Sequence, residues 1–269
     1  MASHIVTRPV IALLTDFGTR DHFVAAMKGV VLGICPDATL VDISHDIARH
    51  DILGGALELE AVVPYLPPGT VVVAVVDPGV GSDRRGVAIE AGDLRLVGPD
   101  NGLLSRAAAS RSPRRAVTLN NPAFARASVS RTFEGRDRFA PAAAWLASGV
   151  ALEELGPPAS ELVQCDVPEA VVSAEGIEGV VLRVDHFGNL ITNVHRSTLE
   201  RIHGPITVRV AGAALQGLSQ TYAELAPGAL CALVGSTDRL EIAVNGGSAA
   251  TLLGAERGAA VWVGGHSRA

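Results

Sequence analysis

Apolar residues in the first half of the chain alternate between continuous runs and positions with helical spacing. The continuous runs are typical of buried parallel strands and cover residues 10–14, 39–43 and 70–76. Helical spacing follows the first two runs, at residues 23–34 and 51–65, and a hairpin pattern spans residues 87–98. Such repeated strand–helix–strand units predict an α/β fold with a mostly parallel sheet sandwiched by helices.

A different pattern begins after residues 157–168, a loop-like segment bracketed by prolines. Short runs of β-forming residues, separated by Gly, Asn and Pro, lie at residues 179–184, 190–194, 206–210, 230–234, 240–244 and 259–263. No helical period of any length accompanies them, and several short strands at this spacing predict a small β-barrel. We therefore expect an α/β domain at residues 1–168 and a C-terminal β-barrel domain at residues 169–269.

Composition and charge limit the partners of the chain. It has 269 residues, 48% of them hydrophobic, and a formal net charge of -6 at pH 7. This acidic balance argues against a nucleic-acid partner, and no apolar run reaches the ~20 residues of a membrane helix. Three widely spaced cysteines without a CxxC pair, and no signal-like apolar run at residues 1–9, lead us to expect a cytoplasmic protein.

Several common kinds of site are excluded by missing motifs. The histidines have no HxH or HExxH spacing, so we predict no metal. Lys28 is the only lysine, which excludes a Gly-Lys-Ser/Thr phosphate loop. No GxGxxG follows the first predicted strand, which argues against NAD or FAD. Candidate chemistry therefore rests on carboxylates, arginines and turns.

Acidic residues stand at the carboxyl ends of two predicted strands, where open α/β sheets bind ligands. Asp16 follows the first strand, and there a carboxylate can accept hydrogen bonds from vicinal ribose hydroxyls; a turn or N-cap role explains it equally well. Asp77 follows the third strand and shares a glycine-rich loop with Arg84. Either these two side chains surround a small polar ligand such as water, or they form a surface salt bridge.

Two further segments carry candidate residues. A helix is predicted at residues 139–146, and its expected N-cap is Asp137. Glu134 lies before this cap, so helix capping does not account for an acidic residue at its position. Residues 185–189, Asp-His-Phe-Gly-Asn, interrupt a strand pattern and fit a β-turn. The same residues offer the Phe187 ring to stack on a base and the Asn189 amide to read its edge.

In their order and spacing, six motifs together resemble the S-adenosyl-L-methionine (SAM) hydroxide adenosyltransferases. These are the adenosine-forming SAM hydrolases, related to the fluorinase and chlorinase enzymes. The resemblance extends over residues 10–263. The motifs are Thr-Asp-Phe-Gly at 15–18, Cys-Pro-Asp at 35–37, Asp-Pro-Gly-Val-Gly-Ser at 77–82, Pro-Asp-Asn-Gly-Leu-Leu at 99–104, Asp-His-Phe-Gly-Asn at 185–189 and Leu-Glu-Ile-Ala-Val-Asn at 240–245.

The resemblance implies a homotrimer whose active sites lie between the α/β domain of one subunit and the barrel of the next. It implies that Asp16 holds the ribose hydroxyls, and that Asp185 and Ser236 grip the amino and carboxylate ends of the methionine part. Phe187 and Asn189 match the adenine site. SAM is then a substrate, and no cofactor is implied.

The water-activating residues are where this sequence departs from the family. Asp77 and Arg84 match two members of a trio, but Glu134 stands where the family has histidine. Thr237 likewise replaces the arginine that follows the serine in the fluorinase. Either Glu134 takes over orientation of the water, or the activity is altered.

The implied reaction is SN2 attack of activated water at ribose C5′, giving adenosine and L-methionine. One alternative is a SAM- or adenosine-binding protein with little turnover. A halide-using adenosyl transferase is disfavoured, because Asp77 and Glu134 would repel a halide in a pocket of low dielectric. A generic nucleotide-binding α/β protein is the third alternative.

Overall fold

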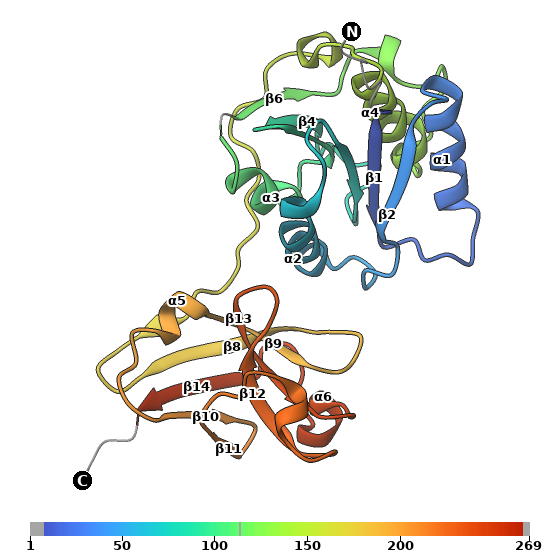
Figure 1. Ribbon diagram of the computed structural model, residues 1–269. Coiled ribbons are helices and arrows are strands. Elements are labelled where there is room, and N and C mark those ends of the chain that lie inside the picture. The colour runs from blue at the N-terminus through green and yellow to red at the C-terminus, as the bar shows by residue number, and fades with distance from the viewer. Residues whose placement is uncertain (1–7, 113, 266–269) are drawn as a thin grey trace, which may run out of the picture. The chain divides into compact units, whose positions relative to one another are not determined.

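A computed structural model describes residues 8–112 and 114–265, which leaves most of the N-terminal segment 1–9 considered above outside the described residues. The chain forms two compact units, Met1–Asp166 and Val167–Ala269 (Figure 1). The first is an α/β unit and the second is a nearly closed antiparallel barrel, as the apolar pattern predicts.

The sheet of the first unit has the strand order β2-β1-β3-β5-β4-β6. Its strands are β1 (Val10–Thr15), β2 (Thr39–Ser44), β3 (Val71–Val75), β4 (Gly86–Ala91), β5 (Leu94–Pro99) and β6 (Arg114–Thr118). The pairs β1–β2, β1–β3 and β3–β5 are parallel, whereas β4 runs antiparallel to β5 and β6. Thr15 pairs with Val75, so β1 and β3 end side by side.

Helices cover both faces of this sheet. They are α1 (Phe23–Ile34), α2 (Ile52–Val62), α3 (Ser105–Ala109) and α4 (Ala140–Ala147), with short turns η1 (Val63–Tyr65), η2 (Pro122–Phe124), η3 (Gly135–Phe139) and η4 (Leu152–Leu155). Alternate residues of β1 face opposite cores: Leu13 packs with α1 and α4, and Leu14 packs with α2 and α3. Figure 1 shows the two pairs of helices on opposite sides of the strands.

The predicted N-cap at Asp137 is wrong. A π-helical turn, η3, precedes α4, and Asp137 lies inside that turn with a fully buried side chain. Its carboxylate pairs with Arg136 and Arg126 and accepts a hydrogen bond from the backbone N–H of Ser130. These partners lower the pKa of Asp137 although burial opposes its charge. Glu134 is the residue that directly precedes the turn.

The second unit is built from antiparallel strands in the order β11-β10-β14-β8-β9-β13-β12, with β7 paired to β8. The strands are β7 (Val171–Val172), β8 (Ile177–Val184), β9 (Leu190–His195), β10 (Ile206–Val210), β11 (Ala213–Gln216), β12 (Leu230–Val234), β13 (Arg239–Val244) and β14 (Ala260–Gly265). Short helical pieces α5 (Arg196–Leu199), η5 (Tyr222–Glu224) and α6 (Ala249–Leu253) join them. Across the described residues of both units, we find no helix long and apolar enough to cross a membrane.

Candidate functional site

The parallel ends of β1 and β3 place two of the expected site residues on one edge of the sheet. Asp16 directly follows Thr15, and Asp77 lies two residues beyond Val75, the register partner of Thr15. Asn101 holds this edge in place, because its Nδ2 donates a hydrogen bond of 2.9 Å to the carbonyl of Val76. The Asn101 side chain thus fixes the backbone immediately before Asp77.

The loop after Asp77 folds back so that the guanidinium of Arg84 donates hydrogen bonds to the carboxylate of Asp77. Nε of Arg84 lies 3.0 Å from both carboxylate oxygens, and its Nη2 lies 2.5 Å from Oδ2. The return of the loop requires glycine at position 81, whose φ is +81° and where a Cβ would meet the carbonyl oxygen of Arg131 at 2.6 Å. The side chain of Asp77 is only 5% exposed and that of Arg84 only 11%. A surface salt bridge does not describe this pair.

Glu134 completes a cluster of three charged side chains. Its Oε2 lies 2.6 Å from Nη2 of Arg84, and its Oε1 lies 3.6 Å from Nη2 of Arg138. The close contact is an ion pair and not an aligned hydrogen bond, since Oε2 is buried with no hydrogen-bond partner among the described residues. Among the described residues this oxygen thus lacks the hydrogen-bond donor that a buried carboxylate oxygen normally has.

Two carboxylates keep the guanidinium of Arg84 charged. Burial alone would favour its neutral form, but hydrogen bonding to Asp77 and the ion pair with Glu134 raise the pKa of Arg84 above its usual value. The guanidinium carbon also lies 5.3 Å from the centre of the buried Phe139 ring. One permanent cation thus sits between two anions in a largely desolvated cluster.

Aromatic packing connects Glu134 to the loop that carries Asp16. Phe133 and Phe17 contact each other edge to face, with ring centres 6.0 Å apart. Gly135 lies close to both rings, because an added Cβ there would be 3.3 Å from the sulfur of Met27 and 3.6 Å from an atom of each ring. The π-helical turn therefore starts close to α1 and directs Glu134 toward the same sheet edge as Asp16 and Asp77.

Asp16 is half-buried, and a second network holds its loop. Oδ2 of Asp16 accepts a hydrogen bond of 2.9 Å from the backbone N–H of His50. The hydroxyl of the preceding Thr15 lies 2.8 Å from Nδ1 of His45, whose Nε2 lies 3.0 Å from Asp42. These bonds fix the loop at the end of β1, which fits both a turn role and a ribose-binding role for Asp16.

The four expected ligand residues of the barrel line one pocket of about 740 Å³; they are Asp185, Phe187, Asn189 and Ser236. Phe187 is 73% exposed, an unusual state for a residue with a large apolar side chain. Asn189 is buried. Thr237 lines the same pocket.

Asp185 organises the turn between β8 and β9. Its Oδ1 accepts hydrogen bonds from the backbone N–H groups of Phe187 and Asn189, at 2.9 and 2.8 Å. Its Oδ2 accepts one from Nδ2 of Asn189, at 2.9 Å. The β-turn interpretation of these residues is thus confirmed, and three of about four acceptor positions on the Asp185 carboxylate are already used.

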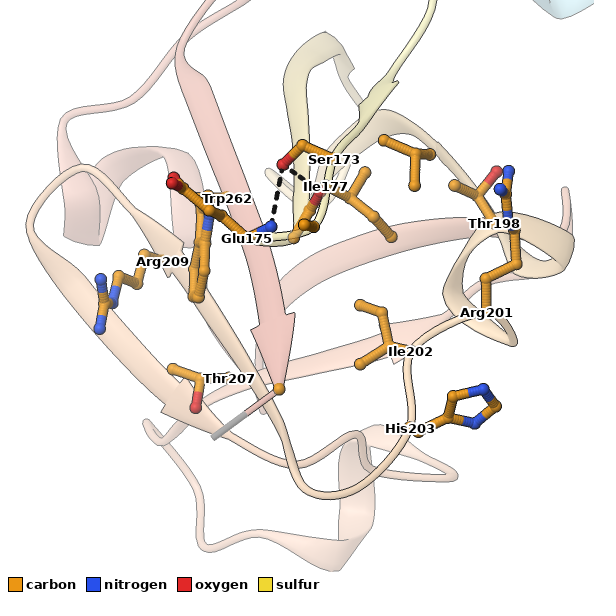
Figure 2. Close-up of a pocket in the computed structure, with 14 residues that line it drawn as sticks. Ser173, Glu175, Ile177, Thr198, Arg201, Ile202, His203, Thr207, Arg209 and Trp262 are labelled. Carbon is orange, nitrogen blue, oxygen red and sulfur yellow. Dashed lines mark hydrogen bonds between the residues drawn. The ribbon is translucent and has the colours of Figure 1, made fainter. Parts of the chain in front are cut away.

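A second pocket of about 800 Å³ lies elsewhere on the barrel, along the β7–β8 turn, α5, β10 and the end of β14 (Figure 2). Ser173 closes the turn by hydrogen bonds with the N–H of Glu175 and the carbonyl of Gly176. Arg209 stacks on Trp262 at 4.6 Å, on the side of the pocket opposite Arg201 (Figure 2). None of the expected site residues lines this pocket.

Sequence reasoning missed three residues at these sites. Asn101 was named only within the motif at 99–104, although two residues after the end of β5 a side chain can brace the sheet edge. Glu241 and Tyr222 line the barrel pocket and were not singled out. Glu241 stood in the motif Leu-Glu-Ile-Ala-Val-Asn, where one carboxylate inside an apolar strand is the signal that could have identified it. In the part of the chain that the structure describes, no group of three His, Cys, Asp or Glu residues is arranged to hold a metal ion.

Comparison with known proteins identifies relatives over most of the chain. Residues 11–156 match the profile of the SAM hydroxide adenosyltransferase N-terminal domain, and residues 179–262 match that of the C-terminal domain. A protein from Salinispora tropica named (R)-S-adenosyl-L-methionine hydrolase is 46% identical over 253 residues, covering 93% of this chain and 95% of the relative. A fluorinase from Actinopolyspora mzabensis is 32% identical over 72% of this chain and 74% of its own length.

Structural comparison agrees with the sequence comparison. The crystal structure of a conserved protein from Thermotoga maritima matches with a TM-score of 0.89 at 31% sequence identity. The match covers 94% of this chain and 99% of that protein. Both units therefore have counterparts in a solved relative.

Proposed function

Because the chain belongs to the SAM hydroxide adenosyltransferase family, we propose that it hydrolyses SAM to adenosine and L-methionine. The family profiles match both units, and relatives that are 42–46% identical carry the name (R)-S-adenosyl-L-methionine hydrolase. We extend the (R) form of SAM named for these relatives to this chain. The observation that carries the mechanism is the position of Arg84 between Asp77 and Glu134.

In the proposed reaction, a water molecule bound at these three side chains attacks C5′ of the ribose. The C5′–S bond breaks, its electron pair goes to sulfur, and methionine leaves as a neutral thioether. Asp77 takes one proton from the water. Oε2 of Glu134 accepts a hydrogen bond from the remaining O–H, which stays on the oxygen that attacks C5′ and becomes the 5′-hydroxyl of adenosine. Arg84 stabilises the developing hydroxide by a charge-assisted hydrogen bond.

Water positioning and exclusion of bulk solvent supply the rest of the rate. The attacking oxygen must lie behind C5′, in line with sulfur, and clamping by a rigid cluster reduces the entropy cost of that geometry. Charge is neutralised as the hydroxide approaches the sulfonium, so the low exposure of Asp77 and Arg84 favours the transition state over the separated charges. No general acid is needed, because the leaving group is neutral.

The other expected site residues bind the ribose, adenine and methionine parts of SAM. The backbone N–H of His50 donates to Oδ2 of Asp16. The other carboxylate oxygen, Oδ1, accepts hydrogen bonds from the ribose hydroxyls. Phe187 stacks on adenine, and Asn189, oriented by Asp185, reads its edge. Asp185 and Ser236 bind the amino and carboxylate ends of the methionine part. SAM is a substrate here, and the proposed reaction needs no cofactor.

We further propose a homotrimer in the cytoplasm, in which catalytic residues of one subunit act on SAM held by the barrel of another. The support is that the water-activating residues and the adenine and methionine residues belong to different compact units. Sedimentation that shows a monomer with full SAM hydrolysis would contradict this assembly.

The cluster also bears on the choice between water and halide. Asp77 and Glu134 balance the charges of Arg84 and Arg138, and both carboxylates face the position assigned to the nucleophile; a halide in contact with their oxygens would meet local repulsion in a desolvated site. Water is polar and neutral and can donate to both carboxylates. The cluster therefore favours hydrolysis over halogenation.

The deciding experiment is incubation of the purified protein with each sulfonium diastereomer of SAM, with and without chloride, followed by chromatography. We expect adenosine and methionine from the (R) form, at a rate that chloride leaves unchanged. Binding of SAM without product over hours would identify a binding protein instead. Accumulation of 5′-chloroadenosine would identify a halide-using transferase.

A further inference from the structure

A buried histidine that the proposed mechanism does not use lies beside the loop that carries Asp16. His45 follows β2 directly and is 6% exposed. Its Nδ1 lies 2.8 Å from the hydroxyl of Thr15, the fully buried last residue of β1, and its Nε2 lies 3.0 Å from Oδ1 of Asp42. Lys28 of α1 extends this chain of contacts, because its Nζ lies 2.7 Å from Oδ2 of Asp42.

The partners assign one direction to these hydrogen bonds. The hydroxyl of Thr15 accepts a bond of 3.2 Å from the backbone N–H of Phe17, so its own hydrogen is available to Nδ1 of His45. The hydrogen of the imidazole then lies on Nε2 and is donated to Asp42. Burial opposes the charge of Asp42, but the hydrogen bonds from Lys28 and His45 outweigh it and lower the pKa of this carboxyl, which keeps it an acceptor.

The order of hydroxyl, imidazole and carboxylate is that of a nucleophilic triad, but these residues cannot act as one. Thr15 is fully buried, and its hydroxyl already has two hydrogen-bond partners, so no substrate atom reaches it. What the three groups can do is fix the backbone at Thr15. The residue that this orients is the next one in the chain, Asp16.

The segment after β2 holds the loop after β1 at three places. His45 supplies two of these contacts, since its side chain meets Thr15 and its carbonyl accepts a hydrogen bond of 2.8 Å from the N–H of Gly18. His50 supplies the third, because its N–H donates to Oδ2 of Asp16. Asp16 therefore lies between two backbone positions that a single histidine fixes.

An irregularity in the ladder brings His45 to this place. Leu13 pairs with Asp42 and Leu14 pairs with Ser44, so the register of β1 with β2 shifts by one residue between these pairs. An extra residue of this kind bends a strand and re-aims the side chains that follow it. Asp42 is exposed and His45 is buried, so the hydrogen bonds run from the surface to the buried end of β1.

We propose that His45 is a positioning residue that holds the carboxylate of Asp16 in the orientation required by the 2′- and 3′-hydroxyls of the ribose. It acts through the hydroxyl of Thr15 and the N–H of Gly18, and it does not touch the substrate. The assignment rests on the proposed function, because it takes a nucleoside as the ligand of Asp16. The effect of His45 on affinity is therefore limited to ligands whose sugar carries these hydroxyls.

The test measures the dissociation constants of adenosine and 2′,3′-dideoxyadenosine by calorimetry, because only adenosine has the hydroxyls that Asp16 binds. In the wild type we expect adenosine to bind at least ~10-fold more tightly, the scale of one hydrogen bond to a charged group. We expect Asp16→Ala to abolish this preference. His45→Gln carries its amide near the position of Nε2 and loses the contact with Thr15, and we expect the preference to fall by ~3- to 10-fold.

Two variants test the route through the Thr15 hydroxyl. His45→Asn carries its amide near the position of Nδ1 and keeps the contact with Thr15, so we expect it to retain most of the preference for adenosine. Thr15→Val removes the hydroxyl from the other end of the same hydrogen bond, and we expect the same reduced preference as in His45→Gln. This second route to the result does not require that His45→Gln folds.

Two controls separate positioning from general stability. His203→Asn changes an exposed histidine of the barrel unit, and we expect both dissociation constants to stay as in the wild type. In the Asp16→Ala protein, His45→Gln should cause no further loss of adenosine affinity, because a positioning residue has no effect once the residue that it positions is gone. Circular dichroism of each variant reports whether it is folded.

The outcomes separate this inference from the proposed function. Equal losses for both nucleosides in His45→Gln and Thr15→Val, or a preference unchanged in both, would overturn the positioning role. An additive loss in the double variant would overturn it as well, as would wild-type protein that does not prefer adenosine or binds neither nucleoside. Wild-type protein that shows the expected affinities but forms no adenosine from SAM would overturn the hydrolase proposal and leave the role of His45 standing.

Discussion

Nη2 of Arg84 lies 2.6 Å from Oε2 of Glu134, and the same nitrogen lies 2.5 Å from Oδ2 of Asp77. One guanidinium thus joins a loop after β3 to the start of the π-helical turn before α4. Glu134, which stands where the resemblance to the family implies a histidine, is paired with Arg84 within the cluster. A carboxylate at this position is therefore compatible with water activation.

Substitution of Glu134 tests that compatibility. We expect Glu134→Gln to lower turnover by ~10- to 10²-fold, the scale of a lost hydrogen bond between the water and a charged group, and to leave the dissociation constant for SAM nearly unchanged. Glu134→His should retain more activity than Glu134→Ala. Steady-state kinetics together with calorimetry measure both quantities. Turnover that none of these changes alters would place Glu134 outside the chemistry, and a rate above wild type for Glu134→His would mean that glutamate obstructs the site.

Substitution of Arg84 removes the cation of the cluster and tests its role in stabilising the hydroxide. Arg84→Ala leaves Asp77 and Glu134 buried, close together and without their shared partner. We expect adenosine formation to fall by ~10²-fold or more, because the group that stabilises the developing hydroxide is lost. Arg84→Lys keeps a charge but cannot bridge both carboxylates with a planar fork, and we expect it to recover only part of the rate. Recovery of the full rate by lysine would argue that only net charge matters.

Asp16 is tested through binding. We expect Asp16→Ala to weaken the affinity for both SAM and adenosine by ~1.5–3 kcal/mol, the scale of hydrogen bonds to a charged group. Asp21→Ala, in the exposed segment before α1, serves as the matched control and should leave both affinities intact. Calorimetry that gives wild-type affinities for Asp16→Ala would assign Asp16 to the turn alone.

The sequence predicts the framework of this molecule well, because apolar runs and helical spacing record burial directly. The runs that became β1 and β3 are almost wholly buried, but the run at residues 39–43, also predicted as a buried strand, forms the largely exposed edge strand β2. β6 escaped prediction because it is an edge strand of sequence Arg-Arg-Ala-Val-Thr, with both arginines exposed, and β11 is short and half exposed. The small helices α5 and α6 span too few residues to show a period.

The site was predictable only where a motif coincides with a strand end. Asp16 and Asp77 have this signal, and the pairing of Asp77 with Arg84 follows from one short loop. The approach of Glu134 to Arg84 depends on a π-helical turn and on the packing of Phe17 against Phe133, neither of which has a local sequence pattern. Glu241 was missed for a related reason, because its importance depends on the cross-strand neighbours of a buried position.

Burial raises the pKa of Glu241, which predicts a pH dependence of stability. A carboxyl group whose pKa is higher in the folded than in the unfolded protein stabilises the fold when protonated, and this contribution is lost as the pH rises above the unfolded value. Charged and titratable neighbours of the group are Tyr222, Asp185, Arg183 and Cys231. We expect Glu241→Gln to gain unfolding free energy relative to wild type as the pH rises from 4 toward 8, measured by urea unfolding. A difference that is constant with pH would contradict the shift.

The central claim is that Asp77, in contact with Arg84, activates the water. The most direct measurement is the rate of adenosine formation by Asp77→Asn at saturating SAM, expressed per folded molecule. Asparagine keeps the shape of the side chain and removes both the base and the negative charge. The account predicts a rate lower by ~10²-fold or more with SAM affinity nearly unchanged, and adenosine formation near the wild-type rate would contradict it.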